Sequence, residues 1–389
     1  MANQHKVVLL PGDGIGPEVT RAAAQVLTAA AELFDIPLET EEHLVGWAAV
    51  GEAGDPLPPE TLAACRGARA VFLGAVGHPD ADGEPPERRP ETGLLALRTE
   101  LGCYANLRPL RVTAATSGAS PLRPERVRGT DMMIVRELGG GLYYGTPREL
   151  SLTPPRSAFN TLRYSEDEIR RIAAMGFEVA ARRRRRLVSV DKANVLETSR
   201  LWRTVVEEVA QEHPKVEWSH MLVDRAAMEL VLHPTRFDVI LTSNLFGDIL
   251  SDEMAGIAGT LGLLPSASLG GPTPLFEPVH GSAPDLVGQG KANPVGAILS
   301  GSLLLDHGLA RPDAARAVER AVEEVMAAGI RTPDLAEAGG SEAPAPVDTA
   351  TFTGEVITRL REQDSRSPAR AAASSSNASP HHNHPRGEG

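Results

Sequence analysis

Two aspartates, Asp248 and Asp252, give the first indication of chemistry. They follow a short apolar run at 239–241, and three turn residues separate that run from a helical stretch. Residues four apart lie on one face of a helix, so the two carboxylates repel each other unless a cation lies between them. Hard divalent cations prefer oxygen ligands. The alternative is a pair of solvated acids on an exposed helix, because short motifs also match by chance.

Three arginines suggest a site for an anion. Arg98, Arg108 and Arg136 each lie in or beside an apolar stretch, in a chain whose net charge is −12. One such arginine can serve as a structural ion pair. Three of them at the ends of elements indicate a cluster that binds carboxylate or phosphate groups.

Lys192 and Asp224 each follow a short apolar run, at 187–190 and 221–223. In α/β sheets, ligands bind at the carboxyl ends of the strands. Lys192 is one of only four lysines, and it lies in an otherwise apolar and acidic segment. A salt-bridged surface lysine is the alternative interpretation for it.

The elements that must position these residues alternate between apolar strand runs and amphipathic helices, which predicts an α/β fold. Ser165 and Glu168 form a capping-box pattern at the start of one helix. Segments 74–93, 149–164 and 275–294 read as loops or irregular chain. We expect strands at 6–10, 70–74, 104–110, 131–138, 187–190, 221–223 and 239–241. We expect helices at 17–34, 92–102, from 165 onward, at 197–212, 295–306, 313–328 and 348–362.

The glycine-rich segment 11–18, PGDGIGPE, does not have the spacing of a dinucleotide-binding fingerprint. Its glycines follow G-x-G-x-G before a proline, whereas that fingerprint is G-x-G-x-x-G. We therefore reject a Rossmann domain and expect tight backbone close to a ligand.

Composition excludes several classes of protein. No apolar run approaches about 20 residues and no signal peptide precedes the first strand, so we expect no membrane association. Cys65 and Cys103 form no disulfide framework, which favours a cytoplasmic location. The acidic charge argues against nucleic-acid binding. We interpret arginines 182–186 as a solvated helix end, and the low-complexity tail 363–389 as disordered, with its histidines solvated rather than chelating.

Taken together, these segments resemble the isocitrate and isopropylmalate dehydrogenase family over residues 6–362. The resemblance rests on many motifs in a fixed order. They are PGDGIGPE, RPETGLLALR (89–98), NLRP (106–109), RELGGGLYYG (136–145), SVDKANVLE (189–197), VDRAAM (223–228), TSNLFGDILSD (242–252), EPVHGSAPD (277–285) and ANP (292–294).

The resemblance implies a fold with two domains around a mixed sheet. Residues 1–105 and 259–362 would form the first domain, which carries the NAD-binding loops. Residues 106–258 would form the second, with the dimer interface and the metal and catalytic residues. It also implies a homodimer with shared active sites, in which the neighbouring subunit donates Lys192 and Asp224.

The activity implied is the NAD-dependent oxidative decarboxylation of 3-isopropylmalate in leucine biosynthesis. Arg98, Arg108 and Arg136 would bind the substrate carboxylates. Asp224, which also lies at the substrate, would join Asp248 and Asp252 in holding Mg²⁺ or Mn²⁺. Lys192 would help to deprotonate the substrate hydroxyl, and Tyr143 would protonate the enol; a core tyrosine is the plain alternative for Tyr143.

Resemblance also implies the determinants of specificity. Glu91, Leu94 and Leu95 lie where relatives acting on isocitrate carry polar residues, and leucines suit an isopropyl group. Asp285 and Leu286 match the NAD users, because a carboxylate binds both ribose hydroxyls and repels a 2′-phosphate. The remaining residues expected at the cofactor are Glu277, His280, Gly281, Ser282, Ala283, Pro284 and Asn293.

Two departures from the family pattern and two alternatives remain. Arg225 replaces a residue that is commonly neutral, and Gly139 replaces a common threonine. The chain could act on another 3-substituted malate, such as D-malate, tartrate or homoisocitrate. It could also be a regulatory subunit without chemistry, which the presence of Tyr143, Lys192 and the three aspartates disfavours.

Overall fold

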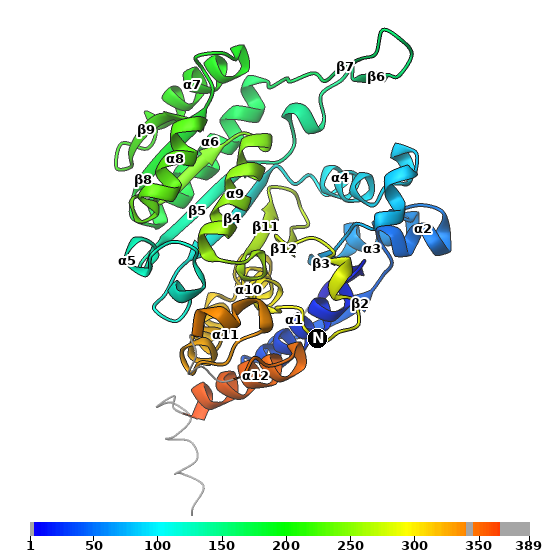
Figure 1. The fold of residues 1–389 in the computed structure, drawn as a ribbon, viewed down its shortest axis with the longest axis vertical. Helices are drawn as coiled ribbons and strands as arrows, with labels where there is room; N and C mark the ends of the chain where they lie inside the picture. Colours follow the sequence, from blue (N-terminus) through cyan, green and yellow to red (C-terminus); the bar gives the residue numbers. More distant parts are fainter. Residues whose placement is uncertain (1–3, 340–344, 366–389) are drawn as a thin grey trace, which may run out of the picture.

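The computed structural model describes residues 4–339 and 345–365. A mixed sheet of ten strands runs through the molecule in the order β2-β1-β3-β12-β11-β4-β5-β10-β8-β9, with helices on both sides (Figure 1). The predicted α/β fold with a mixed sheet is confirmed. The strands of this sheet are β1 (His5–Gly12), β2 (Leu38–Glu42), β3 (Ala70–Ala75), β4 (Ala105–Arg111), β5 (Asp131–Glu137), β8 (Arg186–Asp191), β9 (Glu217–Leu222), β10 (Val239–Thr242), β11 (Pro265–Leu269) and β12 (Leu275–Pro278).

The two wings of the sheet are parallel and its centre is antiparallel. β11 runs antiparallel to both of its neighbours, β12 and β4, and β4 runs antiparallel to β5. Every residue of β3 and of β10 is buried, as their continuous apolar runs predict for strands covered on both faces. The longer helices are α1 (Gly16–Leu33), α4 (Pro90–Glu100), α6 (Glu166–Arg182), α7 (Glu197–Ala210), α8 (Val223–Leu232), α9 (Asn244–Ala258), α10 (Val295–Leu303), α11 (Pro312–Ala327) and α12 (Thr349–Ser365).

Several elements lie where the sequence predicts none. β12 begins the segment expected to be a loop, and β6 (Glu149–Ser151) and β7 (Ser157–Phe159) form a hairpin within 149–164. Figure 1 shows this hairpin projecting from the body of the molecule. β2 and the short helices α2 (Trp47–Ala53) and α3 (Pro59–Gly67) are further additions.

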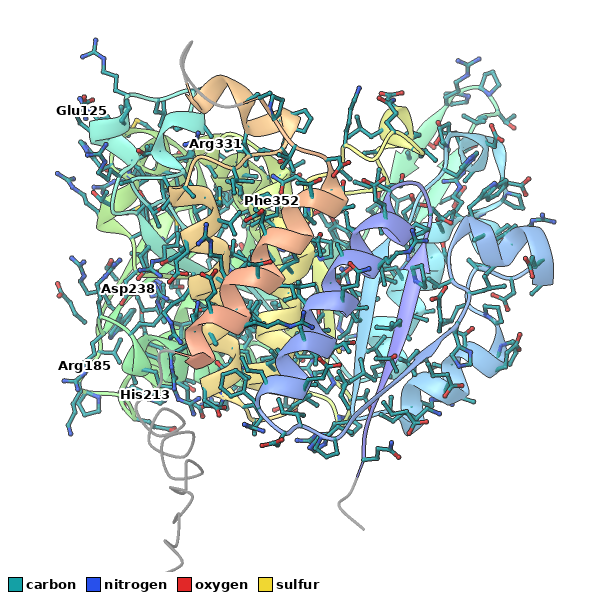
Figure 2. All side chains as sticks on the ribbon, turned by 90° about the horizontal axis from the view of Figure 1, so that it is seen from below. Glu125, Arg185, His213, Asp238, Arg331 and Phe352 are labelled. Carbon is teal, nitrogen blue, oxygen red and sulfur yellow. The ribbon has the colours of Figure 1, made fainter. Side chains whose placement is uncertain are left out.

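The helix that ends the described chain packs beside the first helix. α12 lies along α1, and Figure 2 labels Phe352 on it, which is fully buried. α12 continues to Ser365, so residues 363–365 are helical and the prediction of disorder from 363 is wrong there. Residues 366–389 lie outside the described residues.

Four of the five arginines at 182–186 are exposed, as predicted for a solvated helix end, and Arg183 is the exception. Arg183 donates a hydrogen bond from Nε to Asp238 Oδ1 at 2.9 Å and from Nη2 to Asp131 Oδ1 at 2.7 Å. The Asp238 side chain, labelled in Figure 2, is fully buried and also accepts a bond from the Arg186 N–H. Arg183 therefore fastens the end of α6 to β5 and to the residue before β10. The capping box of Ser165 and Glu168 at the start of α6 is confirmed.

The sheet draws its two halves from different parts of the chain. β2, β1, β3, β12 and β11 come from residues 5–75 and 265–278, and the other five strands come from 105–242. The division into two domains follows this boundary and stays a prediction. In the described ranges, no helix has both the length and the apolar character needed to cross a membrane.

Candidate active site

The three predicted arginines are brought together and buried. Arg108 on β4 and Arg136 on β5 lie on adjacent antiparallel strands, where Asn106 is directly opposite Arg136. Because alternate residues of a strand share a face, Asn106 and Arg108 lie on the same side of β4. Arg98 is contributed by α4, and all three residues are less than 10% exposed.

Asp248 on α9 is the common partner of this cluster. Arg136 Nη1 pairs with Asp248 Oδ1, Arg108 Nη2 lies 3.4 Å from the same oxygen, and the Tyr143 hydroxyl donates to Oδ2 at 2.5 Å. Burial acts to raise the pKa of Asp248, but Arg136, Tyr143 and Arg108 outweigh it and hold that pKa below its usual value. Asp248 is therefore an ionised carboxylate.

Arg136 is anchored by Asn244, a residue that the sequence did not single out. Arg136 Nε donates to the Asn244 carbonyl oxygen at 2.9 Å, and Nη2 donates to Asn244 Oδ1 at 2.8 Å. Gly247 makes room for the arginine stem, since a Cβ there would lie 2.6 Å from Arg136 Cγ. The motif TSNLFGDILSD contains Asn244 and Gly247, but their contacts with Arg136 are visible only in the folded structure.

Arg98 forms a buried ion pair with Glu277, Nη2 to Oε1 at 2.6 Å. Burial opposes the charge, but Glu277 outweighs it and raises the pKa of Arg98. The Nε atom of Arg98 is buried and has no hydrogen-bond partner among the described residues. Glu277 was expected near the cofactor, and 179 positions of sequence separate it from Arg98, so no local signal could have revealed this pair.

Arg108 is held by neighbours of different kinds. Its Nε donates to Asn106 Oδ1 at 2.7 Å, its Nη1 donates to the Ser251 hydroxyl, and Nη1 lies 4.0 Å from Asp252 Oδ1. Burial and the positive charge of Arg136 lower the pKa of Arg108. An anionic ligand would relieve this repulsion between buried guanidinium groups.

The three predicted metal ligands do not meet within one chain. Asp248 and Asp252 are one turn apart on α9, and the Asp252 side chain is 65% exposed. Asp224, at the start of α8, pairs instead with Lys192, Oδ1 to Nζ at 2.5 Å. Residues 4–339 and 345–365 contain no group of three or more His, Cys, Asp or Glu side chains placed to hold a metal. The metal assignment stays a prediction.

Lys192 and Asp224 form a separate pair. Lys192 follows β8, its backbone N–H donates to the Ser199 hydroxyl at 3.1 Å, and its ammonium group holds the pKa of Asp224 below the usual value. In the described part of the chain, no hydrogen bond or ion pair joins either side chain to the arginine cluster. A single chain thus contains the predicted catalytic groups in two places.

Tyr143 lies at the edge of a cavity of about 1160 Å³ whose lining includes Glu91, Leu95 and Tyr144. Burial, and then the hydrogen bond to Asp248, raise the pKa of Tyr143, so its hydroxyl keeps its proton at neutral pH. Leu95 contributes to the cavity wall. Leu94 packs instead against the smaller core cluster under α4 and is absent from that wall.

The glycine-rich segment packs against the expected cofactor loop. The Ile15 N–H donates to the Ser282 carbonyl at 2.8 Å, and Gly14 has φ +61° and leaves no space for a Cβ, which would lie 2.0 Å from the same oxygen. Asp13 meanwhile accepts bonds from the Trp47 and Ala48 N–H groups at the start of α2. The tight backbone expected here is present, and it shapes the loop beside it.

That loop places its polar residues in different surroundings. Asp285 and Leu286 are exposed on a short 3-10 turn (Pro284–Leu286) that follows the segment 281–283. The Nε2 atom of His280 is buried without a hydrogen-bond partner among the described residues, and burial lowers the pKa of this histidine. Asn293 binds Asp334 and the Val295 N–H, so its side chain already supports the local fold.

A family model described as isocitrate/isopropylmalate dehydrogenase matches residues 6–356. The chain belongs to this family. The family member named 3-isopropylmalate dehydrogenase in Aquifex aeolicus is 49% identical over 358 residues, which cover 92% of this chain and 97% of the relative. The protein of that name in Synechococcus sp. (strain JA-2-3B'a(2-13)) is 53% identical over 341 residues, covering 87% and 92%.

Solved structures of the isocitrate/isopropylmalate dehydrogenase family share the fold. The isocitrate dehydrogenase of Methylococcus capsulatus superposes with a TM-score of 0.81 at 37% identity, covering 92% of this chain and 100% of that one. The two departures from the family pattern have different settings here. Arg225 is exposed on α8, whereas a Cβ on Gly139 would lie 3.0 Å from Arg171 Nη2.

Proposed function

We propose that this protein catalyses the oxidative decarboxylation of 3-isopropylmalate to 4-methyl-2-oxopentanoate and CO₂, with NAD as the oxidant, in leucine biosynthesis. The observation that carries the proposal is the convergence of Arg108, Arg136 and Tyr143 on Asp248. Relatives that are named 3-isopropylmalate dehydrogenase and are about half identical support the choice of substrate.

The buried arginines bind the two carboxylates of the substrate. Arginine forms paired hydrogen bonds with carboxylate oxygens, and such bonds are strongest where water is excluded. The free Nε of Arg98 and the mutual repulsion of Arg108 and Arg136 both favour an incoming anion. Glu277 keeps Arg98 charged and fixes one of its nitrogens.

Asp248 and Asp252, with Asp224 of a second copy, hold Mg²⁺ or Mn²⁺. The donor set fits a hard cation, because it consists of carboxylate oxygens and the Asp252 side chain is open to approach. When bound, the metal ion polarises the substrate oxygens and stabilises negative charge on them. Arg136 and Arg108 position Asp248 for this role by binding its oxygen Oδ1.

Two side chains handle the protons. Lys192 of the second copy would take the proton of the substrate hydroxyl, and bound NAD would supply the acceptor for the hydride of the carbon that bears this hydroxyl. Tyr143 then donates a proton to the enol that remains after CO₂ leaves. The raised pKa of Tyr143 suits a proton donor, since the hydroxyl is protonated when the step begins.

A homodimer supplies the second copy. Large apolar side chains are exposed on the projecting hairpin, at Leu150, Leu152 and Phe159, and on α8 and α9, at Met228, Leu232 and Ile249. Apolar groups gathered on one region of surface mark interfaces. α8 and α9 carry Asp224 and Asp248, so an interface formed by these helices brings the metal ligands of two subunits together.

The loop after β12 binds NAD. Segment 281–284 leads to Asp285, which bonds the ribose hydroxyls and repels the extra phosphate of NADP. His280 offers the unpaired Nε2, while Glu277 links this loop to Arg98 in the substrate site. Leu286, Asn293 and the residues Gly281, Ser282, Ala283 and Pro284 complete the set that we assign to the cofactor.

Leu95 contacts the side chain of the substrate at the cavity wall, to which Glu91 also belongs. Leu94 supports this wall from the core cluster against which it packs. The test is turnover of a panel of substrates with NAD and with NADP, in the presence of Mg²⁺. We expect 3-isopropylmalate with NAD to exceed D-malate, tartrate, homoisocitrate and isocitrate in kcat/KM by at least about tenfold. A higher value for any of the others would replace the proposed substrate, and no turnover of any would contradict the activity.

A further inference from the structure

Asn244 lies at the start of α9, directly after β10, and is only 1% exposed. Its backbone N–H donates to the Tyr164 hydroxyl at 3.0 Å, and its backbone carbonyl and Oδ1 both accept from Arg136. Its side-chain nitrogen donates to the carbonyl oxygens of Gly140, at 3.0 Å, and Leu138, at 3.3 Å. Every polar group of this residue is therefore engaged.

The bonds of Asn244 go to two parts of the site. Asp248, which binds both Arg136 and Tyr143, and the contact of the Arg136 guanidinium with the Tyr143 ring also connect these parts. One part is the guanidinium of Arg136, which Asn244 holds by Nε and Nη2 while Asp248, one helical turn later, holds Nη1. The single hydrogen of Nε is thereby used, whereas Nη1 and Nη2 each carry a second hydrogen that remains for a ligand. If Arg136 were mobile, these hydrogens would no longer be held in a fixed direction toward the ligand.

The other part is the segment 138–143, which ends in Tyr143. This segment is rich in glycine, and Gly141 has φ +76°, so the backbone has little intrinsic rigidity. Glu137 accepts bonds from the Gly139 and Gly140 N–H groups, which fixes the donors of the segment. Asn244 fixes the acceptors at Leu138 and Gly140.

We infer that Asn244 is a positioning residue that sets the substrate-binding Arg136 and the proton donor Tyr143 in register with each other. The inference rests on the proposed function for the roles of these two residues. The position of Arg136 relative to Tyr143 matters because a displacement of about 1 Å in an active site can lower the rate about 100-fold. α9 thus carries two of the three predicted metal ligands and also the amide that orders the groups around them.

Asn244→Asp separates the two contacts of the amide. Aspartate keeps the oxygen that accepts from Arg136, and its charge strengthens that bond. It replaces the nitrogen donor by a second oxygen, which faces the carbonyl oxygens of Leu138 and Gly140 and repels them. We expect kcat for 3-isopropylmalate to fall about 10- to 100-fold, with KM within about threefold of the wild-type value.

Asn244→Ala removes both contacts, so kcat falls and KM also rises. Asn106→Ala is the matched comparison, because Asn106 accepts from Arg108 Nε at 2.7 Å but makes no bond to segment 138–143. We expect this variant mainly to raise KM. The thermal midpoint and the fraction of folded protein are measured for each variant, so that a loss of folded enzyme is not counted as a loss of kcat.

A second readout needs no substrate. Hydrogen–deuterium exchange, followed by mass spectrometry, should show faster exchange of segment 138–145 in Asn244→Asp than in the wild type, with α6 and β3 unchanged. The inference is overturned if folded Asn244→Asp keeps the wild-type kcat, or if its activity falls only in proportion to the folded fraction. Unchanged exchange in this segment also overturns it. If the wild type itself fails to turn over 3-isopropylmalate, the proposed function is contradicted, and the exchange experiment still decides whether Asn244 orders the segment.

Discussion

The Tyr143 hydroxyl donates a 2.5 Å hydrogen bond to Asp248 Oδ2, while Arg136 binds the other oxygen of the same carboxylate. One side chain on α9 therefore organises a tyrosine from the segment after β5 and an arginine from β5 itself. Asp248 has two functions in this account, because it balances buried positive charge and also belongs to the proposed metal site.

Asp248→Asn tests both functions. The variant removes a charged ligand, so activity should fall steeply and recover in part at high Mg²⁺ concentration. It also leaves Arg136 and Arg108 buried with less compensation, which should lower the free energy of unfolding by about 3 kcal/mol. Asp252→Asn is the control, since the Asp252 side chain is largely exposed, and should lose activity with little change in stability. Normal turnover of Asp248→Asn at low Mg²⁺ would refute the metal assignment.

Leu95→Ser and Leu94→Ser should differ in what they change. Leu95 lines the cavity beside Tyr143, so its loss should reduce kcat/KM for 3-isopropylmalate about 10- to 100-fold and affect malate, which lacks the branch, far less. Leu94 packs on the core, so its replacement should mainly lower the thermal midpoint. Both quantities are measured for both variants. Equal losses on the two substrates in Leu95→Ser would show that this wall does not contact the isopropyl group.

Much of the sheet is predictable from local pattern, but its centre is not. The fully buried run of β10 and the capping box before α6 are short-range signals, and both were found. β12 was read as part of a loop and β11 was assigned to no element, because LFEP and PSASL are short and contain proline or serine. The buried serines are satisfied only by distant partners, with Ser266 donating to the Glu277 carbonyl and Ser268 accepting from Asn106.

The residue types of the site were predictable, but most of their contacts were not. The three arginines and the aspartates of α9 carry charge in apolar or acidic surroundings, which marks them in the sequence. Asn244 was not singled out, and Glu277 was expected at the cofactor and not at Arg98, because each binds an arginine more than 100 positions away. Within the run at 182–186, only Arg183 departs from the predicted solvated end, because the buried Asp238 binds it.

Asp238→Ala tests whether Arg183 anchors the end of α6. The variant removes a fully buried aspartate and leaves the mostly buried Arg183 without its main partner, which should lower the free energy of unfolding by about 3 kcal/mol. Asp131→Ala removes the other, half-exposed partner of Arg183 and should cost less than about 1 kcal/mol. Both values come from urea unfolding of the purified protein. Similar small losses in the two variants would show that Arg183 anchors nothing and belongs with the solvated arginines.

His220 on β9 should make stability depend on pH. Burial and then the charge of Arg203 lower the pKa of His220, although Asp191 and Glu207 lie within 4 Å of its ring nitrogens. The unfolded chain then binds a proton more readily, so stability is full above the ordinary value of 6.5 and falls as the pH decreases below it. His220→Gln should show a smaller loss between pH 7.5 and 5.5 in urea unfolding. The same loss in both proteins would contradict this assignment.

The central claim is an active site that combines the arginine cluster of one subunit with Lys192 and Asp224 of another. Mixing Lys192→Ala with Arg98→Ala tests it most directly. Each variant is inactive by itself, but after subunit exchange half of the dimers are heterodimers, in which one site carries both changes and the other carries neither. We expect NADH formation from 3-isopropylmalate to return to about a quarter of the wild-type rate, given random exchange. Two variants that remain inactive after mass spectrometry confirms heterodimers would contradict the shared site.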